Sequence, residues 1–104
     1  MSQMRHHSIV VTSDDFDIIN LAHKKAVSLF EHLVSPIIRS RANGFQSFFI
    51  APDGSKEGWE TSDHYDINRK DYVNYLNTFG LAVLYCEFYF GSDISPKAKL
   101  IHFN

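Results

Sequence analysis

A stripe of apolar residues at helical spacing, closed by a proline, most limits what this chain can fold into. The stripe consists of Ile19, Ala22, Ala26, Leu29, Phe30 and Leu33. Residues spaced by three and four lie on one face of a helix, and that face must be buried against another element. Pro36 disfavours helical backbone at the residue before it, so we expect the helix to end near Leu33. Ser13, followed by Asp14 and Asp15, is typical of a helix start.

Strand signals on both sides of this helix predict the sheet against which it packs. The β-branched run Ile9-Val10-Val11-Thr12 comes before the helix. Two short extended segments, residues 37–41 and 45–51, come after it. They are joined by Ala42-Asn43-Gly44, and Asn-Gly favours a hairpin turn because both residues tolerate a positive φ.

A second helix and two more strands complete the predicted order. The helix is expected from about Tyr65 to Thr78, and Gly80 is a suitable stop after it. Its apolar side is predicted to consist of Ile67, Tyr72, Tyr75, Leu76 and Phe79. Residues 81–90 give the strongest strand signal, and residues 98–103 give a last one. This order predicts a single α+β domain over residues 1–104, a ferredoxin-like β-α-β-β-α-β fold with an extra C-terminal strand and two helices on one face of an antiparallel sheet.

Charge and cysteine content narrow the classes of partner. The net charge of −2 argues against a binder of duplex nucleic acid, which needs a strongly basic surface. Cys86 is the single cysteine, so we expect no internal disulfide, and its place in an apolar run predicts a buried thiol. The longest apolar stretch is too short to span a bilayer, so we expect a cytoplasmic protein with no membrane contact.

The face of the sheet away from the helices is predicted to carry function. Period-two alternation assigns to it His6, Arg39, Arg41, Tyr85, Glu87 and Tyr89. The more apolar alternate positions of the fourth strand, Leu84, Cys86, Phe88 and Phe90, are expected to pack on the helices. Arginine binds phosphate in bidentate fashion and tyrosine stacks on bases, so this face predicts a ligand surface. We also expect the same face to form an interface between copies in a homo-oligomer, which is compatible with a ligand surface because sites often form between subunits. A plain solvated face is the alternative.

A glycine-rich turn adds two candidate ligand contacts. In Asp53-Gly54-Ser55-Lys56-Glu57-Gly58-Trp59, backbone N–H groups and Lys56 could meet a phosphate and the indole could meet a base. The alternative is that Trp59 packs as a plug over the core, in an ordered loop. The predicted ligand-binding residues are therefore His6, Arg39, Arg41, Lys56, Trp59, Tyr85 and Tyr89.

Catalytic and metal motifs are weak. His6 and His7 are adjacent on a strand and point to opposite faces, so they do not share one metal ion. His6-His7-Ser8-Ile9 fits the H-x-[ST]-x element of two-histidine phosphoesterases, but the later candidates at His64 and His102 lack the Ser or Thr. No nucleophile elbow occurs. We therefore expect no catalytic residue, metal ligand or cofactor, with a phosphoesterase acting on a cyclic nucleotide as the alternative.

An RNA-binding or protein-interaction module is a further alternative. Residues 43–50 resemble the aromatic strand of RNA-recognition motifs. The first predicted strand lacks the partner aromatic residue, and the net charge is unsuited to RNA.

Three segments together resemble small proteins encoded by phages and prophages. They are His6 to Ser13, Ser47 to Trp59 and Tyr89 to Asp93. Within phages the chain is most similar to the anti-Thoeris sponge family, which implies an oligomer that binds and sequesters a cyclic ADP-ribose isomer in the host cytoplasm without cleaving it. The family's ligand contacts do not map onto this chain residue by residue, so the predicted site stays the one derived from the sheet face.

Overall fold

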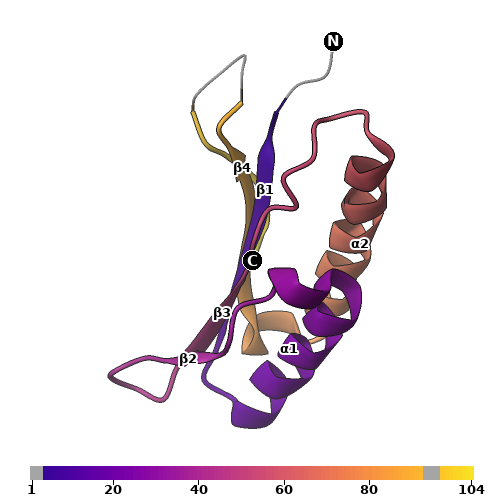
Figure 1. Ribbon diagram of the computed structural model, residues 1–104. Coiled ribbons are helices and arrows are strands. Elements are labelled where there is room, and N and C mark those ends of the chain that lie inside the picture. Colours follow the sequence, from indigo (N-terminus) through magenta and orange to yellow (C-terminus); the bar gives the residue numbers. More distant parts are fainter. Residues whose placement is uncertain (1–3, 93–96) are drawn as a thin grey trace.

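Two helices lie against one face of a five-stranded antiparallel sheet in the computed structural model, which describes residues 4–92 and 97–104 (Figure 1). The elements are β1 (His6–Ser13), α1 (Phe16–Phe30), β2 (Ile38–Arg39), β3 (Gln46–Ile50), α2 (Glu60–Asn77), β4 (Leu84–Phe90) and β5 (Lys99–Phe103). Short 3₁₀ turns, Glu31–Leu33 and Gly80–Ala82, follow the two helices. The predicted α+β fold is confirmed.

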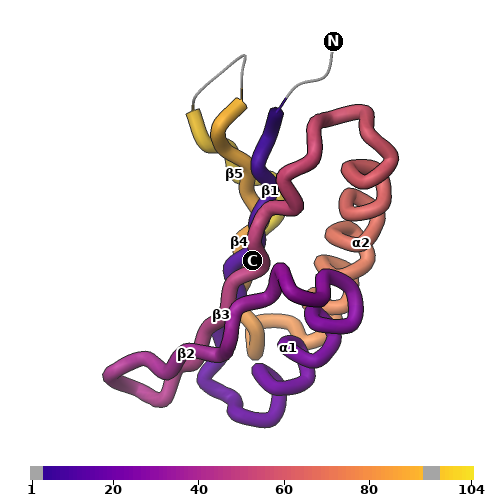
Figure 2. Tube along the Cα trace, viewed as in Figure 1, coloured from indigo at the N-terminus to yellow at the C-terminus, as the bar shows by residue number. Residues whose placement is uncertain are grey.

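The strands follow the order β2-β3-β1-β4-β5 (Figure 2). The central strand β1 is antiparallel to both neighbours, so that Val10 lies opposite Phe49 on one side and Cys86 on the other. The first four strands thus have the ferredoxin-like arrangement, and β5 adds an edge beside β4. We call the surface of the sheet away from the helices the open face.

Helix α1 forms where its apolar stripe predicts it. Ile19, Ala22, Ala26 and Phe30 are all buried in the core. The N-cap is Asp15, two residues later than Ser13 indicates, because the Asp15 carboxylate accepts the hydrogen bond from Ile18 N at 3.0 Å. Ser13 instead donates its hydroxyl proton to the Ala82 carbonyl, which ties the end of β1 to the turn before β4.

The hairpin between β2 and β3 has the predicted turn. Asn43 and Gly44 have φ angles of 62° and 69°, and Ser40 N donates to Phe45 O at 2.9 Å. Both strands are shorter than expected: β2 covers only Ile38–Arg39, and β3 covers Gln46–Ile50.

Helix α2 begins at Glu60, five residues earlier than the predicted Tyr65, so residues 60–64 are helical. Acidic side chains in the first turn, Glu60 and Asp63, favour this start through the helix dipole. The predicted apolar position Ile67 is wrong, since its side chain is 62% exposed. The other predicted positions are confirmed: Tyr72 and Leu76 are buried, and Tyr75 and Phe79 pack against the core. Ser62, Arg69 and Val73 are also buried on this side.

Strand β4 faces the opposite way from the prediction. Tyr85 and Glu87 are buried on the helix side, Tyr89 is half-buried there, and Leu84, Cys86, Phe88 and Phe90 lie on the open face. The polar ends of the inward residues are satisfied under the helices: Tyr85 donates to Asn77 Oδ1 at 2.7 Å. Cys86 is consequently half-buried on the open face rather than a core thiol.

Tyr72 joins the two helices inside the core. Its hydroxyl donates to the Ala22 carbonyl at 2.7 Å, and its ring meets Phe30 edge-on with centroids 5.8 Å apart. Burial, with a smaller contribution from Tyr75, raises the pKa of Tyr72 well above its usual range. The phenol therefore stays neutral wherever the protein is folded.

Candidate functional site

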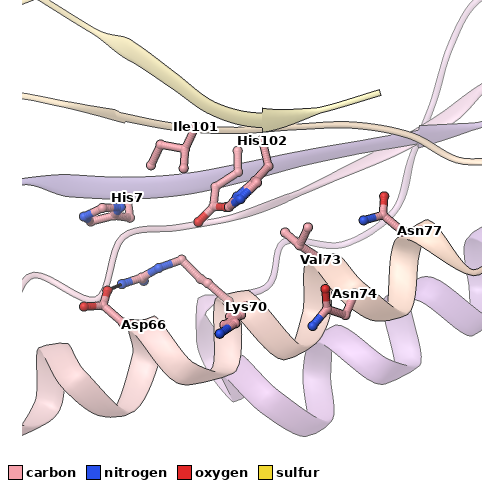
Figure 3. A pocket seen from close by; sticks show the side chains of 10 residues that line it. His7, Asp66, Lys70, Val73, Asn74, Asn77, Ile101 and His102 are labelled. Atoms are coloured by element: carbon pink, nitrogen blue, oxygen red, sulfur yellow. Dashed lines mark hydrogen bonds and ion pairs between the residues drawn. The ribbon is translucent and has the colours of Figure 1, made fainter.

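A cavity of about 350 Å³ lies between α2 and the end of the sheet formed by β1, β4 and β5 (Figure 3). The strands contribute His7, Glu87, Ile101 and His102, and the helix contributes Asp66, Arg69, Lys70, Val73, Asn74 and Asn77. Figure 3 shows the strand residues and the helix residues on opposite walls. Such a mixture of ionisable and amide side chains under a helix is unusual, because buried polar groups cost stability unless they are paired.

His7 is held at one end of the cavity by a glutamate from the glycine-rich turn. Its Nε2 atom is 3.1 Å from Glu57 Oε1. The imidazole also lies against the Tyr89 ring, with centroids 5.7 Å apart. The Arg5 guanidinium covers the same Tyr89 ring at 5.0 Å. One ring nitrogen of His7 is thus committed to a carboxylate, and the other remains for a ligand.

His102 is held by a second glutamate. It lies opposite Glu87 in the ladder between β5 and β4, and Nδ1 of His102 is 2.5 Å from Oε1 of Glu87. The register shifts after this pair, between Glu87 and Phe88. A bulge of this kind leaves Ile101 unpaired and lets it line the cavity beside His102.

Arg69 is a nearly buried cation, 4% exposed, on the cavity wall of α2. Its guanidinium lies 2.5 Å from Asp66 Oδ1 and 3.6 Å from Asp53 Oδ1. Ser55 donates a short hydrogen bond to the other oxygen of Asp53. Arg69 thus has two carboxylate partners, and its contact with Asp53 ties the turn after β3 to α2.

The remaining wall of α2 offers donors that have no carboxylate partner in the described part of the chain. Lys70 forms no ion pair there, and Asn74 forms no side-chain hydrogen bond. Asn77 accepts from Tyr85 through its oxygen, which leaves its amide N–H groups for other partners. Val73 and Ile101 add an apolar surface.

Five of the seven sequence-predicted ligand residues lie away from this cavity. His6 is on the open face beside Phe90, with ring centroids 5.4 Å apart. Arg39 and Arg41 are exposed at the hairpin edge, and Lys56 is exposed in a bridge to Met4. Trp59 precedes α2 and is 49% exposed, so it is not a plug over the core.

The other two predicted residues border the cavity from the helix side of the sheet. Tyr85 bonds Asn77, and Tyr89 lies against His7. The seven residues are therefore not brought together. Of the six residues assigned to the open face, Tyr85, Glu87 and Tyr89 lie on the helix side instead. Arg39 also lies on the helix side by register, because it pairs with the buried Gln46.

Sequence reasoning missed most of the cavity. One available signal was Arg69, which stands at helical spacing with Tyr65, Tyr72, Val73 and Leu76 and is the charged member of that stripe. The placement of His7 on the helix side was predicted correctly by alternation. The position of His102 depends on a bulge in the ladder, which leaves no mark in the local sequence.

Within residues 4–92 and 97–104, no group of three or more His, Cys, Asp or Glu side chains is arranged to hold a metal ion. Neither helix in this part of the chain is long and apolar enough to cross a membrane. Comparison of the chain with protein families, with characterised proteins and with solved structures finds no match.

Proposed function

We propose that this protein binds a small phosphate-bearing molecule of mononucleotide size in the cavity under α2 and holds it without covalent change. One observation carries the proposal: both carboxylates that line the cavity already hold a cationic or imidazole partner, while several of its donors have no partner in the described part of the chain. Glu87 is committed to His102, and Asp66 is committed to Arg69. A ligand that enters this cavity therefore meets hydrogen-bond donors.

The unoccupied donors suit an anion with several oxygens. They are the Lys70 ammonium, the amides of Asn74 and Asn77 and, when the imidazoles are protonated, the second ring nitrogens of His7 and His102. When both imidazoles are protonated, they and the cations Arg69 and Lys70 balance the four carboxylates that line the cavity or pair with its lining, so an anion meets no net negative charge. These carboxylates belong to Asp53, Glu57, Asp66 and Glu87. Hydrogen bonds to charged groups contribute about 1.5–3 kcal/mol each, so two or three would support micromolar binding after the cost of association.

The size of the cavity favours a small ligand. A volume of about 350 Å³ lies at the lower end of the range for small-molecule sites. It corresponds to the space of about a dozen water molecules at ~30 Å³ each. Val73 and Ile101 provide an apolar surface against which a sugar or base can pack. The cavity thus suits a mononucleotide better than a complete dinucleotide.

An NMR titration of the labelled protein with inorganic phosphate, AMP and cyclic AMP tests the proposal. We expect amide shifts at His7, along residues 66–77 of α2 and at residues 101–102. His7→Gln should weaken binding about tenfold, a loss of one charged hydrogen bond. His6→Gln is the matched control, because His6 is the adjacent residue on the open face. Equal effects of the two variants, or no saturable shifts with any probe, would contradict the proposal.

The biological role expected from the phage resemblance stays a prediction. A protein that sequesters a nucleotide immune signal should carry that nucleotide through purification. Heat denaturation of the purified protein followed by mass spectrometry should therefore release an intact phosphate-bearing molecule, and the His7→Gln preparation should release less of it.

Acid–base cleavage of a phosphoester is the second candidate, favoured by the two Glu–His pairs in one cavity. A carboxylate that holds one nitrogen of an imidazole orients the other for proton transfer. In hydrolysis one histidine would take a proton from water as its oxygen bonds phosphorus, while the other would give a proton to the departing oxygen as its P–O bond breaks. Phosphorus NMR of cyclic AMP incubated with the protein separates the candidates: an unchanged signal supports binding alone, and a new monoester signal supports cleavage.

A further inference from the structure

The open face of the sheet carries an apolar surface that residues 4–92 and 97–104 do not cover. Large hydrophobic side chains from four strands, Val10, Phe49, Leu84, Phe90, Leu100 and Phe103, are between 37% and 64% exposed there. On β4 this is the opposite of what a lone domain favours, because Glu87 is directed inward while Leu84 and Phe90 are directed outward. A contiguous exposed apolar surface of this kind is typical of an interaction site.

We propose that the open face packs against the same face of a second copy of this chain, with the two sheets face to face. The first argument is charge. Among the described strand positions on this face, only His6 and Cys86 carry a titratable side chain. A two-fold interface brings each patch against itself, so a charged patch would oppose like charges, whereas an uncharged apolar patch is self-complementary.

The second argument is area. The five strands comprise 27 residues. Each residue takes up about 3.3 Å along its strand and ~4.8 Å between neighbouring strands, so one face of the sheet has a projected area on the order of 400 Å². Accessible area exceeds projected area, because side chains stand up from the sheet. Two such faces together present about 800 Å² in projection, so their accessible area approaches the roughly 1,000 Å² that a specific interface needs. Sheets that pack this way lie about 10 Å apart with their side chains interdigitated.

The mass of the full chain in solution tests this proposal. Sedimentation velocity from 1 to 100 µM should give twice the 12.0 kDa mass of one chain, with dissociation on dilution. Leu84→Glu places a charge on the open face at a position that is 43% exposed in one chain, and should raise the dissociation constant at least 100-fold. Leu21→Glu is the matched control, since Leu21 is 51% exposed on α1, and it should leave the constant unchanged.

A second measurement needs no variant. Cys86 lies on the open face, so its reaction with a maleimide should slow as the protein concentration rises through the dissociation constant. A monomer at every concentration, an assembly that survives Leu84→Glu in a chain with native circular dichroism, or thiol reactivity independent of concentration would each overturn the proposal.

Discussion

Glu87 and His102 face each other across β4 and β5, with Oε1 of the carboxylate 2.5 Å from Nδ1 of the imidazole. Glu87 is 5% exposed, so the histidine is what satisfies this buried acid. At the other end of the cavity Glu57 holds His7 in a similar way. The cavity is therefore bounded by two histidines whose orientation is fixed by acids on its margin.

Glu87→Gln should reduce phosphate binding and leave the fold intact. A glutamine has the same shape and still accepts a hydrogen bond from His102. It carries no negative charge, however, to balance the positive charge of a protonated imidazole. The exchange of a charged for a neutral hydrogen bond corresponds to about a tenfold loss of affinity. Calorimetry with inorganic phosphate measures it. Glu60→Gln, an exposed change in the first turn of α2, serves as the control and should bind like the parent protein.

Arg69→Met should destabilise the protein strongly. Methionine fills much of the same volume, but it leaves the buried Asp53 and the half-exposed Asp66 without their cation. Removing one partner of a buried ion pair costs about 3–5 kcal/mol, and we expect a value near the lower limit because Asp66 is partly solvated. The midpoint of urea unfolding should fall accordingly. An unchanged midpoint for Arg69→Met, or an equal loss for the neighbouring Lys70→Met, would contradict this account.

Local patterns were sufficient to predict the order of elements. The helix stripe from Ile19 to Phe30 and the Asn43-Gly44 turn each depend on neighbours close in sequence, and both formed as expected. The two faces of β4 were not predictable in the same way. Both sets of alternate residues on β4 are rich in aromatics, so the outcome depended on partners distant in sequence: Asn77 for Tyr85 and His102 for Glu87.

The candidate site was harder to predict than the fold because it is assembled from four distant segments. His7, Glu57, Arg69 and His102 come together only through the crossing of β1, the turn before α2, α2 itself and β5. The spacing of these residues in the sequence does not predict that they lie close together in the fold. The bulge after Glu87, which places Ile101 and His102 at the cavity, is likewise a property of the strand ladder.

Gly91→Ala should destabilise the protein more than Gly58→Ala. Both glycines have a positive φ, 68° and 88°, so each alanine incurs a similar backbone strain. The two sites differ in the space around an added Cβ atom. At Gly91 this atom would lie 2.8 Å from Cδ2 of His6, whereas at Gly58 it would have no contact within 4 Å in the described part of the chain. Overpacking of this kind adds about 1 kcal/mol. Thermal unfolding measures the difference, which should vanish when His6→Ala is combined with Gly91→Ala.

The stability of the protein at alkaline pH should depend on the buried phenol of Tyr72. A tyrosine in the unfolded chain has a pKa of about 10, whereas burial raises the pKa of Tyr72 in the folded protein well above that value. Above pH ~10 the unfolded chain therefore loses a proton that the folded chain keeps, so this residue makes stability fall as pH rises. The contribution is fully present below pH ~10 and decreases by up to about 1.4 kcal/mol per pH unit above it.

Tyr72→Phe separates this effect from the titration of other groups. At pH 7 the variant should be less stable by about 1 kcal/mol, because it lacks the hydrogen bond to the Ala22 carbonyl. Above pH 10 its stability should decline less steeply than that of the parent protein, so the two urea-unfolding curves should converge between pH 10 and 11. Tyr65→Phe is the control, since Tyr65 is only partly buried at the edge of the core. If the stabilities of the parent and Tyr72→Phe proteins fall in parallel above pH 10, the Tyr72 phenol ionises in the folded state. That result would contradict the burial of this side chain.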